Sequence, residues 1–84
     1  MFPVELVECA EGFLPTAAGV VAVRCPKGRD RYELIDAKEC EDIRATVAEK
    51  AQGWASHCKE FLTFWIFVSD DRDRRRQVLE RVED

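Results

Sequence analysis

The most constraining stretch of this sequence is the run from Phe61 to Val68, which is apolar at odd and even positions alike. A strand with one face in water alternates apolar and polar residues, so a run without that alternation is covered on both faces. The run is also far too short to cross a bilayer, which takes roughly 20 residues. It therefore predicts a central strand of a sheet.

Two further strands are expected earlier in the chain. The segment from Gly19 to Cys25 is rich in β-branched valine, and the segment from Arg31 to Asp36 carries tyrosine, leucine and isoleucine. Between them, Pro26 to Asp30 holds a proline and a glycine, residue types that turns prefer. We therefore expect a hairpin. Residues 4–9 are expected to form a short edge strand or an ordered arm.

From about Glu41 the spacing of apolar residues changes to that of a helix. Apolar side chains recur at intervals of four, four, three and four residues, at Ile43, Val47, Ala51, Trp54 and Cys58. Such intervals place them on one side of an amphipathic helix. A second helix is predicted over residues 73–82, because Ser69-Asp70-Asp71 offers an N-cap and acidic residues for its first turn.

These elements predict one α+β domain of the order β-β-α-β-α. Its three-stranded, mainly antiparallel sheet is flanked by helices. Residues 1–18 are expected to form an N-terminal arm and loop, and residues 19–82 the core. A chain of 84 residues leaves no room for a second core. Because 46% of the residues are hydrophobic, intrinsic disorder is excluded.

The charge balance disfavours nucleic acid as the partner. Thirteen basic residues face 17 acidic ones, for a net charge of -4, whereas nucleic-acid binding draws most of its affinity from positive charge. A local basic patch is not excluded by this balance. The first residues carry neither a basic region nor an apolar stretch of signal-peptide length, so a cytoplasmic protein without a membrane segment is expected.

The four cysteines, at positions 9, 25, 40 and 58, are widely spaced and form no CxxC pair. In a cytoplasmic protein this pattern predicts reduced, mostly packed thiols. His57 and Cys58 are the one adjacent pair of metal-type ligands. On a helix, however, neighbours point about 100° apart and cannot chelate one ion together. No metal or other cofactor is expected.

The predicted order of elements resembles the GIY-YIG nuclease domain. Gly19-Val20-Val21 is similar to the strand of the first motif, and the segment from Glu33 to Val47 is similar to the second motif running into the first helix. Trp54 near the helix end and the closing helix from Arg74 to Val82 match a branch of that family. The resemblance spans residues 19–82 and implies a small sheet flanked by helices.

The same resemblance implies that catalysis is lost. Val21 stands where the family has the tyrosine that positions or deprotonates the attacking water. The second motif aligns with Asp36-Ala37-Lys38, so its aromatic residue and its glycine are both missing. Thr46 occupies the position of the arginine that stabilises developing charge. Glu80 alone matches the metal-binding glutamate. The sequence therefore predicts a non-catalytic binding or protein-interaction module, with an unknown protein or a second copy as partner.

Two other functions remain open at this stage. One is a nuclease dependent on Mg²⁺ or Mn²⁺ whose residues are aligned differently, with Tyr32, Arg44 and Glu80 as its groups. The other is an unrelated α+β subunit that takes missing strands from a partner. Arg74 and Arg75 are the candidate contacts to nucleic acid, although the aspartates between the arginines of this segment favour a helix start with internal ion pairs.

Overall fold

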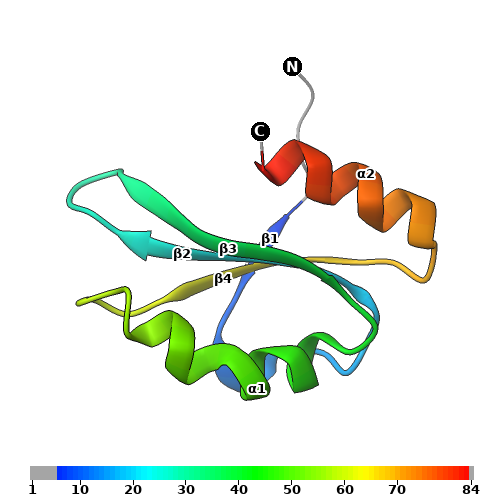
Figure 1. Cartoon of the computed structure of the whole chain (residues 1–84), viewed down its shortest axis with the longest axis horizontal. Helices are drawn as coiled ribbons and strands as arrows, with labels where there is room; N and C mark the ends of the chain where they lie inside the picture. Colours follow the sequence, from blue (N-terminus) through cyan, green and yellow to red (C-terminus); the bar gives the residue numbers. More distant parts are fainter. Residues whose placement is uncertain (1–5, 84) are drawn as a thin grey trace.

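The computed structural model describes residues 6–83, which form a four-stranded antiparallel sheet and two α-helices (Figure 1). In chain order the elements are β1 (Val7–Cys9), a 3-10 turn (Glu11–Phe13), β2 (Gly19–Pro26), β3 (Tyr32–Cys40), α1 (Ile43–Ala55), β4 (Thr63–Val68) and α2 (Arg72–Glu83). The predicted α+β class is confirmed. The sheet has four strands rather than three because β1 pairs with β4. Residues 1–5 of the predicted arm lie outside the described residues.

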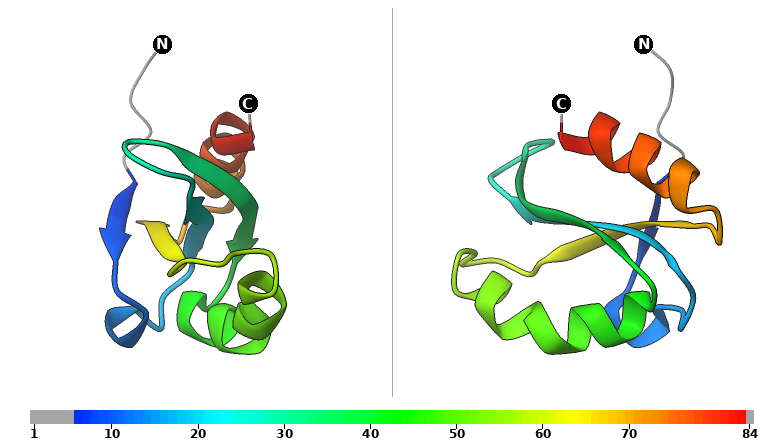
Figure 2. Two further views of the ribbon diagram at one scale, coloured as in Figure 1. Left: turned by 90° about the vertical axis from the view of Figure 1, so that its left-hand side faces the viewer. Right: turned by 45° about the vertical axis from the view of Figure 1, so that its right-hand side comes forward.

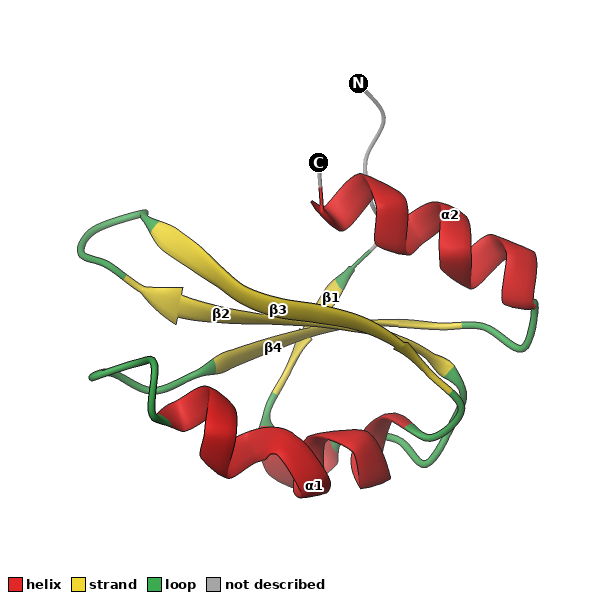
Figure 3. Ribbon diagram, in the orientation of Figure 1, coloured by secondary structure: helices red, strands yellow, loops and turns green. Residues whose placement is uncertain are grey.

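The strand order is β1-β4-β2-β3, and every neighbouring pair is antiparallel. β3 and β4 therefore run in the same direction on either side of β2, and α1 connects them across one face of the sheet (Figures 1 and 2). α2 follows β4 and lies over the opposite face (Figure 3). The sheet is thus the middle of three layers.

β2 and β4 are the inner strands. Four consecutive residues of β2, from Val20 to Val23, are completely buried, as expected for a strand covered on both faces. The predicted inner position of the apolar run is confirmed for Thr63 to Val68, which forms β4 between β1 and β2. Phe61, which the run included, instead lies in the preceding loop and is 90% exposed.

β2 and β3 form the predicted hairpin around a turn at residues 27–31. Gly28 adopts a φ of 118° there, a conformation that favours glycine, and the Lys27 N–H donates to the Arg31 carbonyl oxygen at 2.9 Å. The register shifts between Val23 and Arg24, so that β3 holds one extra residue, Ile35. Bulges of this kind increase strand twist. β3 continues to Cys40, four residues beyond its predicted end.

α1 begins after Asp42, whose carboxylate accepts a hydrogen bond from the Ala45 N–H at 3.1 Å. Its buried side chains join residues of the turn segment and the sheet in one apolar cluster, formed by Leu14, Val21, Val23, Cys40, Ile43, Val47, Trp54 and Phe64. The helix ends at Ala55. Cys58, predicted on the same helical stripe, therefore lies in the following loop.

Gly19 lies where β2, β4 and α1 come together. A Cβ atom at this position would overlap the carbonyl oxygen of Phe67 and stand 2.9 Å from Cδ1 of Ile43. Glycine is required here by the close approach of backbone, not by a turn. Within residues 6–83, neither helix has the length and apolar character that a membrane crossing needs.

Candidate functional site

Two of the positions that the family resemblance assigns to catalysis, Val21 and Thr46, lie on the α1 side of the sheet, whereas Glu80 lies on α2. Val21 is completely buried in β2 and faces Lys38 across the β2–β3 pairing. Thr46 is half-buried on α1, with its side chain beside the Cys40 thiol. A valine side chain cannot accept a proton, so Val21 cannot activate water. It serves the apolar cluster instead.

The residues of the alternative nuclease lie in three separate places. Tyr32 begins β3, at the turn end of the sheet. Arg44 belongs to α1, where its Nε donates to the Leu14 carbonyl oxygen at 2.7 Å, and Glu80 is exposed on α2. Because α1 and α2 cover opposite faces (Figure 2), the sheet separates Arg44 from Glu80. These residues form no common site in this structure.

The two arginines considered for nucleic-acid binding have different environments. Arg75 is 6% exposed; its Nε donates to the Glu39 carboxylate at 2.9 Å and its Nη1 to the Ser69 carbonyl oxygen at 3.0 Å. Arg74 is exposed, with its guanidinium 5.8 Å from the centre of the Phe67 ring. Arg75 thus ties α2 to β3, and Arg74 alone of the pair reaches the surface.

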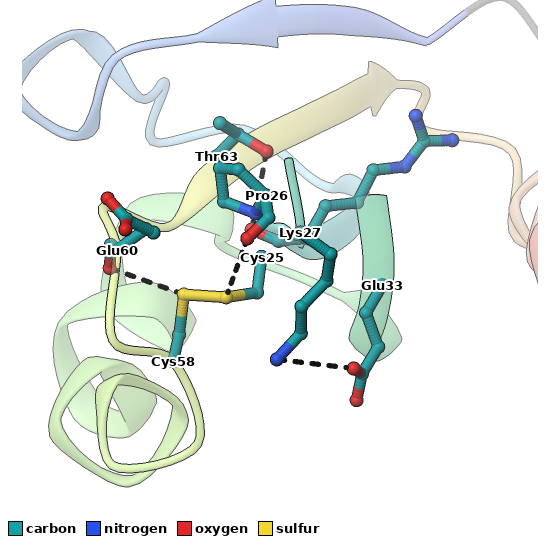
Figure 4. The surroundings of a disulfide bond; sticks show 8 residues. Cys25, Pro26, Lys27, Glu33, Cys58, Glu60 and Thr63 are labelled. Atoms are coloured by element: carbon teal, nitrogen blue, oxygen red, sulfur yellow. Dashed lines mark hydrogen bonds and ion pairs between the residues drawn. A yellow bond between two sulfur atoms is a disulfide. The ribbon is translucent and has the colours of Figure 1, made fainter. Parts of the chain in front are cut away.

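The sequence predicted reduced thiols, and for two cysteines this is wrong. Cys25, at the end of β2, forms a disulfide with Cys58 in the α1–β4 loop, with 5.7 Å between their Cα atoms (Figure 4). The two residues stand 33 positions apart, and no local spacing pattern marks a pair of that kind. Cys25 is the last residue but one of β2 and Cys58 lies three residues after the end of α1, so only the packing of the loop against the strand brings the pair together. Cys9 and Cys40 are free.

Cys40 is the buried free thiol. Its Sγ lies 3.6 Å from the Gly19 carbonyl oxygen. Burial raises the pKa of this thiol, and Asp42 and Glu39 raise it further, while Thr46 and Arg75 oppose the shift. A thiol held protonated is a poor nucleophile and a poor metal ligand. Among the described residues, no group of three metal-ligating side chains could hold an ion.

An open pocket of about 720 Å³ surrounds the disulfide. It lies between the β2–β3 turn and the α1–β4 loop, and its polar side chains come from Lys27, Ser56, His57, Lys59 and Glu60. Two of these are lysines and one is a glutamate, so the pocket is slightly positive although the chain as a whole has a net charge of -4.

The other exposed feature at this end of the molecule is part of the sheet itself. α2 contacts β2 and β3 near Glu39 and leaves the hairpin end uncovered (Figure 1). There Tyr32 is 49% and Leu34 40% exposed. Leu34 pairs with Arg24, whose guanidinium lies 5.1 Å from the centre of the Trp65 ring. We call these four residues the open sheet face.

The outer edge of β3 borders the open sheet face. No strand within residues 6–83 pairs with this edge, which is nine residues long. An unpaired edge presents backbone N–H and carbonyl groups to any extended chain that approaches it. The adjoining turn carries Arg29 and Arg31, neither of which forms an ion pair with another described residue.

Comparison with known proteins gives no relative: no protein family, no curated protein and no solved structure matches this chain.

Proposed function

We propose that this chain is a non-catalytic domain of GIY-YIG-like architecture that binds an extended segment of a partner protein. The segment adds to the outer edge of β3 and covers the open sheet face. The observation that carries this proposal is the nine-residue strand edge bordered by exposed Tyr32 and Leu34. Strand addition uses backbone hydrogen bonds for affinity and side-chain contacts for specificity. A cytoplasmic location remains a prediction.

The arrangement of the candidate catalytic residues within residues 6–83 favours a binding role over cleavage. Phosphodiester cleavage needs a water-activating group and a counter-charge within reach of one phosphate. Val21 cannot supply the first, and Arg44 is held against the Leu14 carbonyl oxygen. Glu80 lies beyond the sheet on the other helix. The nuclease alternative thus finds no support in how its three candidate residues are arranged.

The charges near β3 favour an acidic partner segment. Arg29 and Arg31 stand on the adjoining turn, and Lys27 there is paired with Glu33 at 3.5 Å. Arg24 adds a further positive charge within the open sheet face. A matching segment has apolar side chains at alternate positions, to cover Tyr32 and Leu34, and carboxylates at the end that meets the turn. This chemistry describes the proposed partner.

The surface favours protein over single-stranded nucleic acid. Base stacking needs the free face of an aromatic ring. Arg24 already lies over the Trp65 ring, which leaves Tyr32 as the one exposed ring of the open sheet face, and the chain carries a net charge of -4. A second copy is disfavoured as the partner because the bulge at Ile35 interrupts the alternation of β3. Two such strands cannot keep a common register along their whole length.

The proposal is tested by selecting binders from a library of random linear peptides on the immobilised protein. We expect the selected peptides to combine acidic residues with alternating apolar ones. They should bind Tyr32→Ser/Leu34→Ser at least about tenfold more weakly, the loss expected when a few apolar contacts are removed. Val7→Ser/Phe13→Ser is the matched control, because Val7 and Phe13 are also exposed, at 66% and 81%, but lie outside the open sheet face. This control should bind the peptides like the native chain.

Chemical-shift mapping locates the bound peptide. The largest amide shifts are expected in β3, with Arg29→Glu/Arg31→Glu weakening acidic peptides selectively. Shifts centred elsewhere, or equal affinity for both serine variants, would refute the docking site. Titration with labelled single-stranded RNA and DNA and light scattering over a concentration series complete the test. If RNA or DNA binds the native chain but not Tyr32→Ser/Leu34→Ser, the open sheet face binds nucleic acid and not a peptide. If the native chain forms a dimer that this variant loses, the partner is a second copy.

A further inference from the structure

The two sulfurs of the disulfide differ in their access to solvent. Both cysteines line the pocket at the turn end, but Cys25 is 1% exposed, whereas Cys58 is only half-buried. Figure 4 shows the bond running between β2 and the α1–β4 loop, with Glu60 next to Cys58. The Cys58 Sγ stands 3.2 Å from the Glu60 carbonyl oxygen. A nucleophile that enters the pocket therefore meets Cys58 first.

The two lysines of the pocket favour a small anionic ligand. Lys59 follows Cys58 directly and Lys27 lies across the pocket in the β2–β3 turn, while the loop side also carries His57 and one carboxylate, that of Glu60. Lys27 shares its charge with Glu33 at 3.5 Å, but both side chains remain half-exposed. With about 720 Å³ of open volume, the pocket is large enough for a small peptide or a metabolite of similar size.

We propose that Cys58 Sγ is the site at which a small anionic thiol opens the Cys25–Cys58 disulfide. The thiolate of the incoming molecule attacks Cys58 Sγ, a new sulfur–sulfur bond forms, and the Cys25–Cys58 bond breaks with its electron pair on Cys25 Sγ. The proton that the incoming thiol released ends on Cys25. A second molecule of the small thiol then attacks the mixed disulfide at the sulfur of the first molecule. Cys58 leaves as a thiol, and the two small molecules are joined by a disulfide.

Opening the disulfide releases the α1–β4 loop, which forms one side of the pocket. The disulfide holds the α1–β4 loop near β2. The hydrogen bond from the Thr63 hydroxyl to the Arg24 carbonyl oxygen, 3.3 Å long, lies after the loop, at the start of β4, and therefore does not hold the loop itself. Helix α1 itself keeps its buried contacts through Trp54. Reduction therefore loosens the loop that carries Phe61 and leaves the apolar cluster in place.

A reducible disulfide is also compatible with the location that the sequence predicts. The sequence predicts a cytoplasmic protein, and disulfides of that compartment are usually transient or regulatory. Cys9 and Cys40 are free thiols. Because the disulfide joins an accessible sulfur to a buried one, it has the arrangement expected for exchange with small thiols rather than for permanent protection from them.

The test compares two thiols of opposite charge on the oxidised full-length chain. Reduced glutathione carries carboxylates, whereas cysteamine carries an ammonium group. After acid quenching, intact mass and peptide mapping should show a single glutathione adduct on Cys58 and none on Cys25. Lys27→Gln/Lys59→Gln should slow opening by glutathione about fivefold without slowing cysteamine, and salt should erase the difference. Lys38→Gln/Lys50→Gln, which removes two lysines outside the pocket, is the matched control and should leave both rates unchanged.

Single-cysteine variants trap the intermediate. With oxidised glutathione, Cys25→Ser should accumulate the Cys58 adduct because the partner thiol is gone, while the buried Cys25 of Cys58→Ser should stay unmodified. An adduct on Cys25, a disulfide that resists millimolar glutathione in the folded chain, or equal slowing of both thiols by the pocket substitutions would overturn the proposal.

Discussion

On the α1 side of the sheet, eight buried residues form one apolar cluster and a disulfide ties the loop after the helix to β2. On the α2 side, the helix buries a charged residue, Arg75, together with Val78, and leaves the hairpin end of the sheet open. Removing apolar surface from water stabilises a fold by about 25 cal/mol per Å², whereas a buried ion pair roughly balances its desolvation cost. The α1 side therefore carries more of the stability, and the α2 side has surface left for binding.

The two tryptophans repeat this difference on a small scale. Trp54, 6% exposed on α1, donates from Nε1 to the Asp36 carboxylate at 2.9 Å. Trp65, on the α2 side of β4, hides its Nε1 from solvent without a hydrogen-bond partner among the described residues, and Arg24 lies over its ring. A buried donor without an acceptor costs about 1–3 kcal/mol. The indole N–H of Trp54 thus has a hydrogen-bond partner, whereas that of Trp65 has none among the described residues.

The largest expected effect is from Ile43→Ala. Ile43 is completely buried in the apolar cluster, and truncating such a side chain costs about 4 kcal/mol because the lost contacts leave a cavity. Leu79→Ala, which removes a half-buried side chain of α2, should cost about half as much or less. Urea unfolding followed by circular dichroism measures both. Equal losses would mean that the two faces contribute equally to stability.

Removing the covalent tie comes next. Cys25→Ser/Cys58→Ser opens a loop of 33 residues, for which the chain-entropy model gives a loss of about 3.7 kcal/mol. The same loss should follow reduction of the native chain by dithiothreitol, and the double variant should be insensitive to that reagent. If the variant and the reduced chain differ by more than experimental error, serine at these positions has effects beyond the missing bond.

Substitutions in the ion pair on the α2 side test what this pair contributes to the free energy of unfolding. Glu39→Ala leaves the Arg75 guanidinium buried beside Ser69 without its carboxylate, and we expect a loss of about 3 kcal/mol. Glu39→Leu/Arg75→Met replaces both charges by apolar groups and should return most of that stability. A double-mutant cycle that adds the single variants Glu39→Leu and Arg75→Met supplies the coupling free energy in thermal unfolding. Additive losses would show that the two side chains do not act as a pair.

The tryptophans provide a matched comparison with a smaller effect. Trp54→Phe removes the hydrogen bond to Asp36 and should cost about 2 kcal/mol. Trp65→Phe removes a donor that has no partner, so the change in the free energy of unfolding should be about zero. Far-UV circular dichroism in urea measures both variants without relying on tryptophan emission. A loss from Trp65→Phe as large as that from Trp54→Phe would contradict the difference between the faces.

The smallest effect concerns pH. Because burial raises the pKa of Cys40 above its usual value of 9.0, the folded chain keeps this proton while the unfolded chain loses it at alkaline pH. Folded chains then bind more protons than unfolded ones, so the contribution of Cys40 to stability falls as pH rises through the unfolded-state value. Cys40→Ala should show a shallower alkaline decline in unfolding free energy. Parallel curves for the two proteins would exclude Cys40 as a cause.

Several parts of the fold follow from short stretches of sequence. The turn residues around Gly28 and the valine run of β2 predict the hairpin, and the spacing of Ile43, Val47 and Trp54 predicts α1. Element ends were less predictable. β3 runs to Cys40 because its second half pairs with the start of β2, a contact between residues about 20 positions apart.

The candidate site was less accessible to sequence reasoning than the fold. Tyr32 was named as a possible catalytic group, and its exposure beside Leu34 became visible only once α2 was placed over the far end of the sheet. Arg75 was considered as a surface cation and is buried against Glu39. In both cases the neighbouring element, rather than the residue type, decides whether the side chain reaches solvent.

The sequence by itself determined which segments become strands and helices, because periodicity, caps and turn residues act over a few neighbouring positions. The tertiary structure alone decided that β1 pairs with β4, that Cys25 meets Cys58, and that Arg44 and Glu80 lie on opposite faces of the sheet. Each of these relations joins residues at least 33 positions apart. They depend on how whole elements pack against one another, which no local pattern of residues encodes.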